Sequence, residues 1–218
     1  MIKVVIFDMD GLLIDSEILY FNIFNDFLNR YGHSMKIEEY TQNCSGKTAI
    51  TNVEYLVNNY HLPLSVKEAY DEKAIIEQEH FDRGVELKQG ALNLLDYLKE
   101  HNYKLIIASS NYREKAIKIL NQHSIIHYFD DFIFGDEIER GKPFPDIFIK
   151  ACEKANELPS NCLVLEDSEA GIQAAHSANI PVICIPDLKH PQDSTLKLAT
   201  CVLQSLDLVI DYINEEIN

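Results

Sequence analysis

Residues 1–17, MIKVVIFDMDGLLIDSE, contain the stretch that decides the fold. Within it, residues 4–7 (VVIF) form an unbroken run of β-branched and aromatic side chains, which predicts a strand buried on both faces of a parallel sheet. Asp8 and Asp10 follow where this strand should end, and Gly11 allows a sharp turn behind them. Open α/β sheets bind ligands at the carboxyl ends of their strands. We therefore expect the two acids to face a crevice, although an acidic turn that only caps the strand fits an isolated DxDG as well.

The length and composition of the chain limit its class and its partners. Its 218 residues suffice for one large domain or for a core domain with an insertion. The 19 Lys and Arg against 35 Asp and Glu give a formal charge of −16, which should repel nucleic acid and anionic membranes. A phosphorylated substrate would therefore need a local positive site. No segment is long and apolar enough for a transmembrane helix, and a strand stands where a signal peptide would, so we expect a cytoplasmic protein.

The five cysteines are scattered, odd in number and without CxxC spacing: Cys44, Cys152, Cys162, Cys184 and Cys201. This pattern favours packed free thiols over a disulfide framework or a zinc site.

The segment after Asp15 changes from a strand pattern to a helical one. Ser16 is a predicted N-cap, and apolar residues recur every three or four positions until Gly32. Further helical patterns lie around residues 36–43, 47–60 and 65–82, and residues 15–82 contain no strand candidate. We predict that residues 15–82 form an all-helical domain inserted after the first strand, with residues 1–14 and 83–218 as the core domain.

Strands and helices alternate in the rest of the chain. Strands are predicted at residues 103–108, 131–134, 162–165 and 181–185. Helices are predicted at residues 91–101, 113–123, 145–156, 170–178 and 206–217, and residues 186–200 are left unassigned. Strict alternation is typical of a doubly wound parallel sheet, so the predicted fold class is α/β.

Polar side chains follow four of the predicted strands: Asp8 with Asp10, Ser109, Lys142 on the loop after the third strand, and Glu166 with Asp167. The carboxyl ends of parallel strands share one edge of the sheet. These side chains are therefore expected to converge, although most of the chain separates the first from the last.

The converging side chains suit phosphoryl transfer. Asp8 and Asp167, with Glu166 as a further candidate, offer the hard oxygen ligands that Mg²⁺ prefers. Ser109 offers a hydroxyl and Lys142 a positive charge, which would hold phosphate oxygens that the carboxylates repel. Acids, metal, hydroxyl and ammonium together provide a nucleophile, charge neutralisation and a proton for the leaving group.

Four motifs resemble those of the haloacid dehalogenase superfamily. They are FDMDG at 7–11, LIIASSN at 105–111, the lysine of RGKPFPD at 140–146, and LVLEDS at 163–168. They occur in the family's order and cover almost the whole chain. The resemblance implies a Rossmann-like core, and the 15–82 block resembles the small helical cap of the subgroup that contains phosphoglycolate phosphatase and β-phosphoglucomutase.

The resemblance also implies roles for the residues of the first and fourth motifs. Asp8 would be the nucleophile that forms an aspartyl phosphate, and Asp10 would protonate the leaving alcohol and then activate water. Asp8, the backbone carbonyl of Asp10, and Asp167 would bind Mg²⁺, with Glu166 in or beside that shell.

The second and third motifs would bind the phosphoryl group. By the same resemblance Ser109, Ser110 and Asn111 hold its oxygens, and Lys142 bridges it to the nucleophile. The resemblance thus implies a Mg²⁺-dependent phosphatase for a small phosphorylated metabolite, such as a sugar phosphate. No nucleic-acid or membrane partner is expected, and we expect a monomer or weak dimer.

Four other functions fit the sequence less well. Dehalogenases of the superfamily lack the second acid, so Asp10 argues against halide chemistry. The mutase branch adds a histidine in the first cap helix, where a gapless alignment places Tyr20, so hydrolysis is favoured over β-phosphoglucomutase activity. A receiver-type signalling domain also uses acids, a hydroxyl and a lysine, but it lacks a helical insertion after the first strand. A binding protein with a dead site is disfavoured because no catalytic position is missing.

Residues 45–48, SGKT, invite a P-loop interpretation that the flanks contradict. Thr41 stands where the earlier glycine is needed, and a polar helical pattern replaces the preceding strand. In the resembling caps a glycine here begins a loop that approaches the active site, so Gly46 and Lys47 are candidate substrate contacts. A solvated helix start explains them as well.

Overall fold

The computed structural model describes residues 1–217 and confirms the predicted α/β class. The chain divides into two compact units, which we name the core unit, residues 1–14 with the chain from Leu87 onward, and the helical unit, residues 15–86. The sequence placed the second junction after residue 82. In the structure the junction lies after residue 86. Val85 is buried, and the Asp15 N–H donates to the Glu86 carbonyl at 2.8 Å, so Val85 and Glu86 belong to the helical unit.

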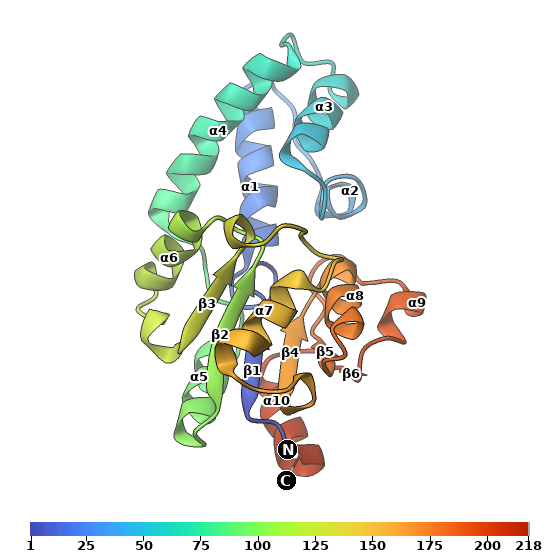
Figure 1. Ribbon diagram of the computed structural model, residues 1–218. Helices are drawn as coiled ribbons and strands as arrows, with labels where there is room; N and C mark the ends of the chain where they lie inside the picture. Colours follow the sequence, from blue (N-terminus) through green and yellow to red (C-terminus); the bar gives the residue numbers. More distant parts are fainter. Residues whose placement is uncertain (218) are drawn as a thin grey trace. The chain divides into compact units, whose positions relative to one another are not determined.

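The core unit is built on a six-stranded sheet in which every adjacent pair is parallel. The order is β3-β2-β1-β4-β5-β6 (Figure 1). The strands are β1 Val4–Phe7, β2 Lys104–Ser109, β3 Asp131–Phe134, β4 Cys162–Glu166, β5 Val182–Cys184 and β6 Cys201–Val202. The first five match the predicted strands. The sixth was not predicted, because two residues give no apolar run to detect.

β1 is central because it is apolar on both faces. All four of its residues are fully buried, and it pairs with β2 on one side and β4 on the other. Val4 and Ile6 belong to the core cluster that contains side chains of α7 (Asp146–Ala155) and α8 (Glu169–Ser177). Strand alternation turns Val5 and Phe7 to the opposite face. Figure 1 shows α7 in front of the sheet and α5 (Ala91–Glu100) behind it.

The remaining helices of the core unit follow the predicted alternation with two differences. They are α6 Arg113–Gln122, α9 Asp193–Leu196 and α10 Asp207–Tyr212. α9 lies in the segment that the sequence left unassigned. The last predicted helix is regular only to Tyr212 and continues as a π-helical segment, Ile213–Ile217.

The helical unit contains the four predicted helices: α1 Ser16–Asn29, α2 Ile37–Asn43, α3 Ala49–Asn59 and α4 Val66–Arg83. α1 and α3 both pack against α4. A capping box of Ser65 and Glu68 starts α4, which explains why the pattern could be read from the sequence. Ser16 is the first residue of α1 instead of its predicted N-cap, a position that Asp15 occupies.

The helical unit begins and ends at neighbouring points of the chain. Ile14 forms an antiparallel bridge with Leu87, and the Lys88 N–H donates to the Leu13 carbonyl at 2.9 Å. The insertion is therefore closed at its base by backbone hydrogen bonds.

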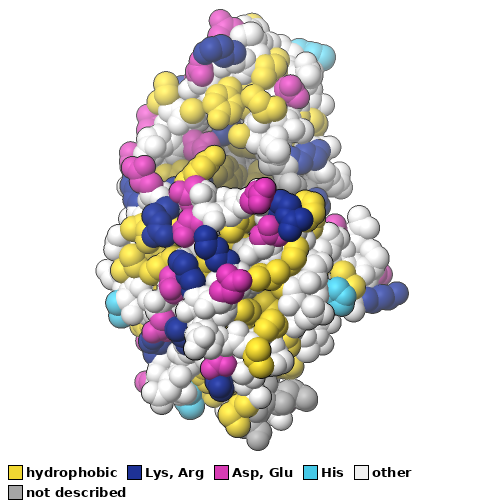
Figure 2. Space-filling view, in the orientation of Figure 1, with side chains coloured by type: hydrophobic (Ala, Val, Ile, Leu, Met, Phe, Trp, Pro, Cys, Tyr) yellow, Lys and Arg dark blue, Asp and Glu magenta, His cyan; other side chains and the backbone are white. Residues whose placement is uncertain are grey.

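No helix among residues 1–217 is long and apolar enough to cross a membrane. The five cysteines are free thiols, as predicted, and four of them are buried. Figure 2 shows basic side chains interspersed with acidic ones on the visible face. Arg113 forms an ion pair with Glu137, and Arg140 forms one with Asp146. On the visible face, therefore, the negative charge is not uniform.

Candidate active site

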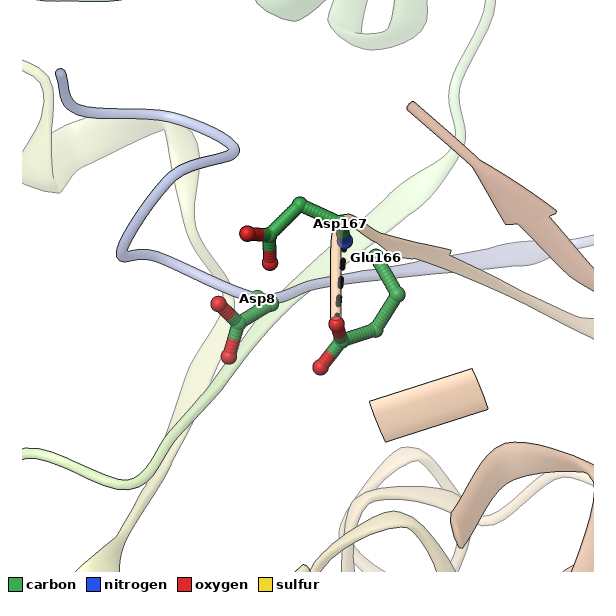
Figure 3. A group of neighbouring side chains, drawn as sticks. All are labelled: Asp8, Glu166 and Asp167. Atoms are coloured by element: carbon green, nitrogen blue, oxygen red, sulfur yellow. Dashed lines mark hydrogen bonds between the residues drawn. The ribbon is translucent and has the colours of Figure 1, made fainter. Parts of the chain in front are cut away.

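Asp8, Glu166 and Asp167 meet at the carboxyl ends of β1 and β4, where the strand order reverses. Asp8 directly follows β1, and its N–H donates to the Leu165 carbonyl at 3.1 Å, which ties it to the neighbouring strand. One ligand oxygen from each of the three carboxylates lies within 4.8 Å of the others. In Figure 3 the carboxylates of Asp8 and Asp167 lie next to one another, whereas the Glu166 side chain folds back toward its own backbone.

Glu166 is fully buried, and the protein engages both of its carboxylate oxygens. Oε2 accepts hydrogen bonds from the N–H groups of Asp167 and Ser168 and from the Ser168 hydroxyl, each at 2.9 Å. Oε1 accepts from Lys142 Nζ at 2.5 Å. These contacts favour Glu166 as an anchor of Lys142 and of the loop between β4 and α8, over Glu166 as a direct metal ligand.

Two glycines make room for the acids. A Cβ at Gly171, in the first turn of α8, would lie 1.8 Å from the carboxyl carbon of Glu166. Gly11 has a φ of +73°, which favours glycine, and a Cβ there would lie 2.3 Å from Oδ2 of Asp167. Any other residue at either position would displace an acidic side chain of the cluster.

Lys142 is the buried cation of the site. Its side chain is only 7% exposed, and its ammonium pairs with Asp8 as well as with Glu166. It also lies 5.1 Å from the ring centroid of Phe148. Three carboxylates and one ammonium leave an excess of −3 + 1 = −2 in the cluster. This is the charge that a divalent cation would cancel, so the donor set fits Mg²⁺.

Burial perturbs the ionisation of the cluster. It raises the pKa of Asp8 from 3.8 to about 7, with the Lys142 ammonium opposing the change. Burial, together with the charges of Glu166 and Asp8, raises the pKa of Asp167 well above 3.8. Burial lowers the pKa of Lys142, but its two carboxylate partners outweigh that effect and the net pKa is raised. Without a cation, then, Asp8 and Asp167 tend to retain protons while the lysine stays charged.

Asp10 is joined to the loop that follows β2. Its carboxylate accepts a hydrogen bond from the Asn111 side-chain amide, and the Asn111 N–H donates to the buried Ser109 hydroxyl at 3.1 Å. Ser110 is exposed on the same loop. Gly135, directly after β3, packs closely against this loop, because a Cβ there would lie 2.3 Å from the Ser110 carbonyl oxygen. The predicted core residues therefore gather at one rim of the sheet.

Sequence reasoning missed a further acid at this rim. Asp187 lies just after β5, its side chain is 5% exposed, and Lys88 Nζ donates to its Oδ1 at 2.6 Å. Its charge contributes to the raised pKa of Asp167, and its Oδ2 would lie 3.1 Å from a Cβ at Gly11. The signal was present, because an acid after the fifth strand obeys the same strand-end rule as the other four clusters.

Gly46 and Lys47 belong to the helical unit, where both line a pocket. The SGKT segment lies in the turn between α2 and α3, so a helix precedes it in place of the strand that a P-loop requires.

Known proteins place this chain in a family. A profile of haloacid dehalogenase-like hydrolases matches residues 5–185, well over half of the sequence. The chain belongs to this family. As an enzyme of the family it is a phosphomonoester hydrolase, the activity that recurs among its relatives.

Two relatives and one solved structure illustrate the similarity. The phosphorylated carbohydrates phosphatase of Thermotoga maritima is 31% identical over 182 residues, which cover 82% of each protein. A probable pseudouridine-5′-phosphatase of Drosophila melanogaster is 34% identical over 207 residues, covering 92% of this chain and 88% of that protein. A structure described as a candidate β-phosphoglucomutase from Thermotoga maritima has a TM-score of 0.86 at 26% identity, covering 99% of this chain and 100% of that one.

Proposed function

We propose that this hydrolase is a Mg²⁺-dependent phosphatase that acts on a small phosphomonoester, such as a sugar phosphate, through an aspartyl-phosphate intermediate. The observation that carries the proposal is the buried Lys142 ammonium, which lies between Asp8 and Glu166 beside the carboxylate of Asp167. Phosphatases for carbohydrate phosphates, for pseudouridine phosphate and for glycerol 3-phosphate among the relatives support the substrate class.

The proposed reaction has two steps on the residues of β1 and its loop. In the first, a carboxylate oxygen of Asp8 forms a bond to phosphorus as the bond to the alcohol oxygen breaks, and Asp10 gives its proton to that oxygen. In the second, Asp10 takes a proton from water, and the water oxygen displaces the carboxylate of Asp8. Free phosphate is released, and both aspartates return to their starting states.

The other rim residues would hold the phosphoryl group for both steps. The Ser109 hydroxyl and the Asn111 loop supply donors, with Ser110 beside them, and the Lys142 ammonium offsets negative charge on Asp8 and on the phosphoryl oxygens. Asp8 and Asp167, with the backbone carbonyl of Asp10, would hold Mg²⁺. When bound, the ion neutralises charge on the phosphoryl oxygens.

The strand order separates this proposal from the signalling alternative. A receiver-type domain has the order 2-1-3-4-5, whereas this sheet has the order β3-β2-β1-β4-β5-β6, with Asp8 at the switch point between β1 and β4. The mutase alternative keeps the same rim and differs in the fate of the phosphoryl group.

The test is phosphate release from a panel of phosphorylated metabolites, measured with Mg²⁺ and with excess EDTA. We expect release that requires Mg²⁺ and that falls by about 10⁴-fold or more in Asp8→Asn, with an unchanged circular dichroism spectrum. Turnover retained by Asp8→Asn would refute the assigned nucleophile. With β-glucose 1-phosphate, glucose 6-phosphate as the product instead of free phosphate would establish the mutase.

A further inference from the structure

Two buried cysteines of the core unit lie side by side, away from the rim. Cys152 belongs to α7 and Cys162 is the first residue of β4, and the two residues are 5% and 0% exposed. Their Sγ atoms are 3.4 Å apart. Cys162 pairs with Val4 at the start of β1, whereas Glu166 and Asp8 lie at the other ends of these two strands. The cysteine pair is therefore separate from the acids of the candidate active site.

The two sulfur atoms are close to the separation that a disulfide needs. An S–S bond is about 2.0 Å long, so the Sγ atoms of Cys152 and Cys162 would have to move about 1.4 Å closer. Both residues belong to one apolar cluster, together with Ala151 and Ala155 of α7. The bond would therefore join two elements whose side chains already share one core.

The hydrogen bonds of the pair give the two thiols different reactivities. The Cys152 thiol donates to Cys162 Sγ, and the Cys162 thiol donates to the Leu158 carbonyl at 3.5 Å. The hydrogen bond between the two sulfurs lowers the pKa of Cys152 and raises the pKa of Cys162. Burial, in contrast, raises the pKa of Cys184 on β5 to about 12. The thiolate is the reactive form of cysteine, so Cys152 is the member of the pair that an oxidant attacks first.

Burial restricts the class of oxidant. Exchange with a bulky disulfide requires access of one sulfur to another, and Cys152 is only 5% exposed. Hydrogen peroxide needs much less space than a disulfide reagent, and it converts a thiolate to a sulfenic acid that a neighbouring thiol can attack. A small peroxide is therefore the oxidant that suits this pair.

We propose that Cys152 and Cys162 form a modification site, at which a small peroxide produces an intramolecular disulfide between α7 and β4. In the first step, the sulfur of Cys152 attacks a peroxide oxygen, the O–O bond breaks, and the released hydroxide takes the thiol proton to form water. In the second, the sulfur of Cys162 attacks the sulfenic sulfur, the S–O bond breaks, and hydroxide leaves with the second thiol proton as water. One hydrogen peroxide thus accepts two electrons from two thiols and becomes two water molecules.

The test treats the reduced full chain with hydrogen peroxide under native conditions and maps the products by mass spectrometry. Trypsin and a glutamate-specific protease together place Cys152, Cys162 and Cys184 on separate peptides. We expect the chain to lose about 2 Da, with a single link between the peptides of Cys152 and Cys162, and dithiothreitol should reverse the change. The link should form about tenfold faster than any oxidation product of Cys184.

Substitutions identify the two sulfurs. Cys152→Ala and Cys162→Ala should each abolish the link, whereas the matched control Cys184→Ala, at another buried cysteine of the sheet, should retain it. If the first two variants fail to fold, the unaltered protein still decides the question. Five thiols that remain free after peroxide treatment, a link between other cysteines, or sulfinic acid at Cys152 without a link would overturn the inference.

The link should also stabilise the fold. It closes a loop between positions ten residues apart and so restricts the unfolded chain. We expect the melting temperature to rise by about 5 °C, to return after dithiothreitol, and to stay constant in peroxide-treated Cys152→Ala. An unchanged or lower melting temperature of the linked chain would show that the bond distorts the core, and would also overturn the inference.

The outcome is independent of the proposed phosphatase reaction. Neither cysteine lies at the rim, so Asp8→Asn should form the same link at the same rate as the unaltered protein.

Discussion

The rim of the core unit and the pocket of the helical unit each contain a buried lysine near a phenylalanine ring, but their charges differ. Lys142 lies among three carboxylates, so its surroundings keep an excess of negative charge. Lys73 pairs with Glu77, and the pocket around it carries as many cations as anions. An excess of negative charge attracts a cation, whereas a paired lysine and glutamate leave no net charge to attract one.

The two lysines also differ in how their partners are brought to them. Lys142 and Asp8 are 134 residues apart in the sequence, and they come into contact because both follow strands of the same parallel sheet. Lys73 and Glu77 are four residues apart on α4, and a single helix suffices. The charges of the rim therefore depend on the whole fold, and those of the pocket largely on local structure.

Replacing Lys142 is expected to have the largest effect. Lys142→Met removes the cation between Asp8 and Glu166 and leaves two buried carboxylates without it. We expect a loss of about 3–5 kcal/mol in the free energy of unfolding. Urea denaturation measures the loss, and Lys3→Met, whose ion pair with Glu157 is exposed, should cost about 1 kcal/mol or less. Equal losses of unfolding free energy in Lys142→Met and Lys3→Met would contradict the expected difference between a buried and an exposed ion pair.

Gly171→Ala tests whether the space beside Glu166 is needed. The new methyl group would overlap the Glu166 carboxyl group, so that side chain must leave the hydrogen bonds of its loop. We expect a loss of about 3 kcal/mol in the free energy of unfolding. The control is Gly141→Ala, because a Cβ at Gly141 meets no atom within 4 Å, and it should be close to neutral.

Magnesium should stabilise the protein through the excess negative charge of the rim. At a Mg²⁺ concentration about 100 times its dissociation constant, the expected gain in unfolding free energy is about 2.7 kcal/mol. Calorimetric melting in the absence of substrate measures it. Asp167→Asn should reduce the gain, and the pocket variant Glu77→Gln should leave it unchanged. A gain that Asp167→Asn does not alter would place the ion elsewhere.

Replacing Lys73 should lower the free energy of unfolding less than replacing Lys142. Lys73→Met leaves one carboxylate, Glu77, which is 26% exposed and retains the Tyr20 hydroxyl. Water and Tyr20 can therefore solvate it, and we expect a loss of about 1–2 kcal/mol. A loss as large as that of Lys142→Met, in the same urea experiment, would contradict the comparison.

Much of this arrangement could be predicted from the sequence because it follows from strand ends. The apolar run of β1 and the alternation after it gave five strands of the sheet, and parallel strands bring Asp8 and Asp167 to one edge. The orientation of Glu166 could not be predicted, because it depends on the absence of a side chain at Gly171.

Some expectations stay predictions. These are the catalytic and metal-binding roles of the rim residues, the action of the helical unit as a cap, the cytoplasmic location and the monomer or weak dimer state.

Because Ile14 and Leu87 form a β-bridge, the chain leaves the core unit and returns to it at neighbouring backbone positions. An insertion whose two ends lie at neighbouring positions can be lengthened, shortened or exchanged without a change in the strand order of the sheet. Exchanging the segment between these two residues for another helical segment should therefore leave the strand order of the core unit unchanged.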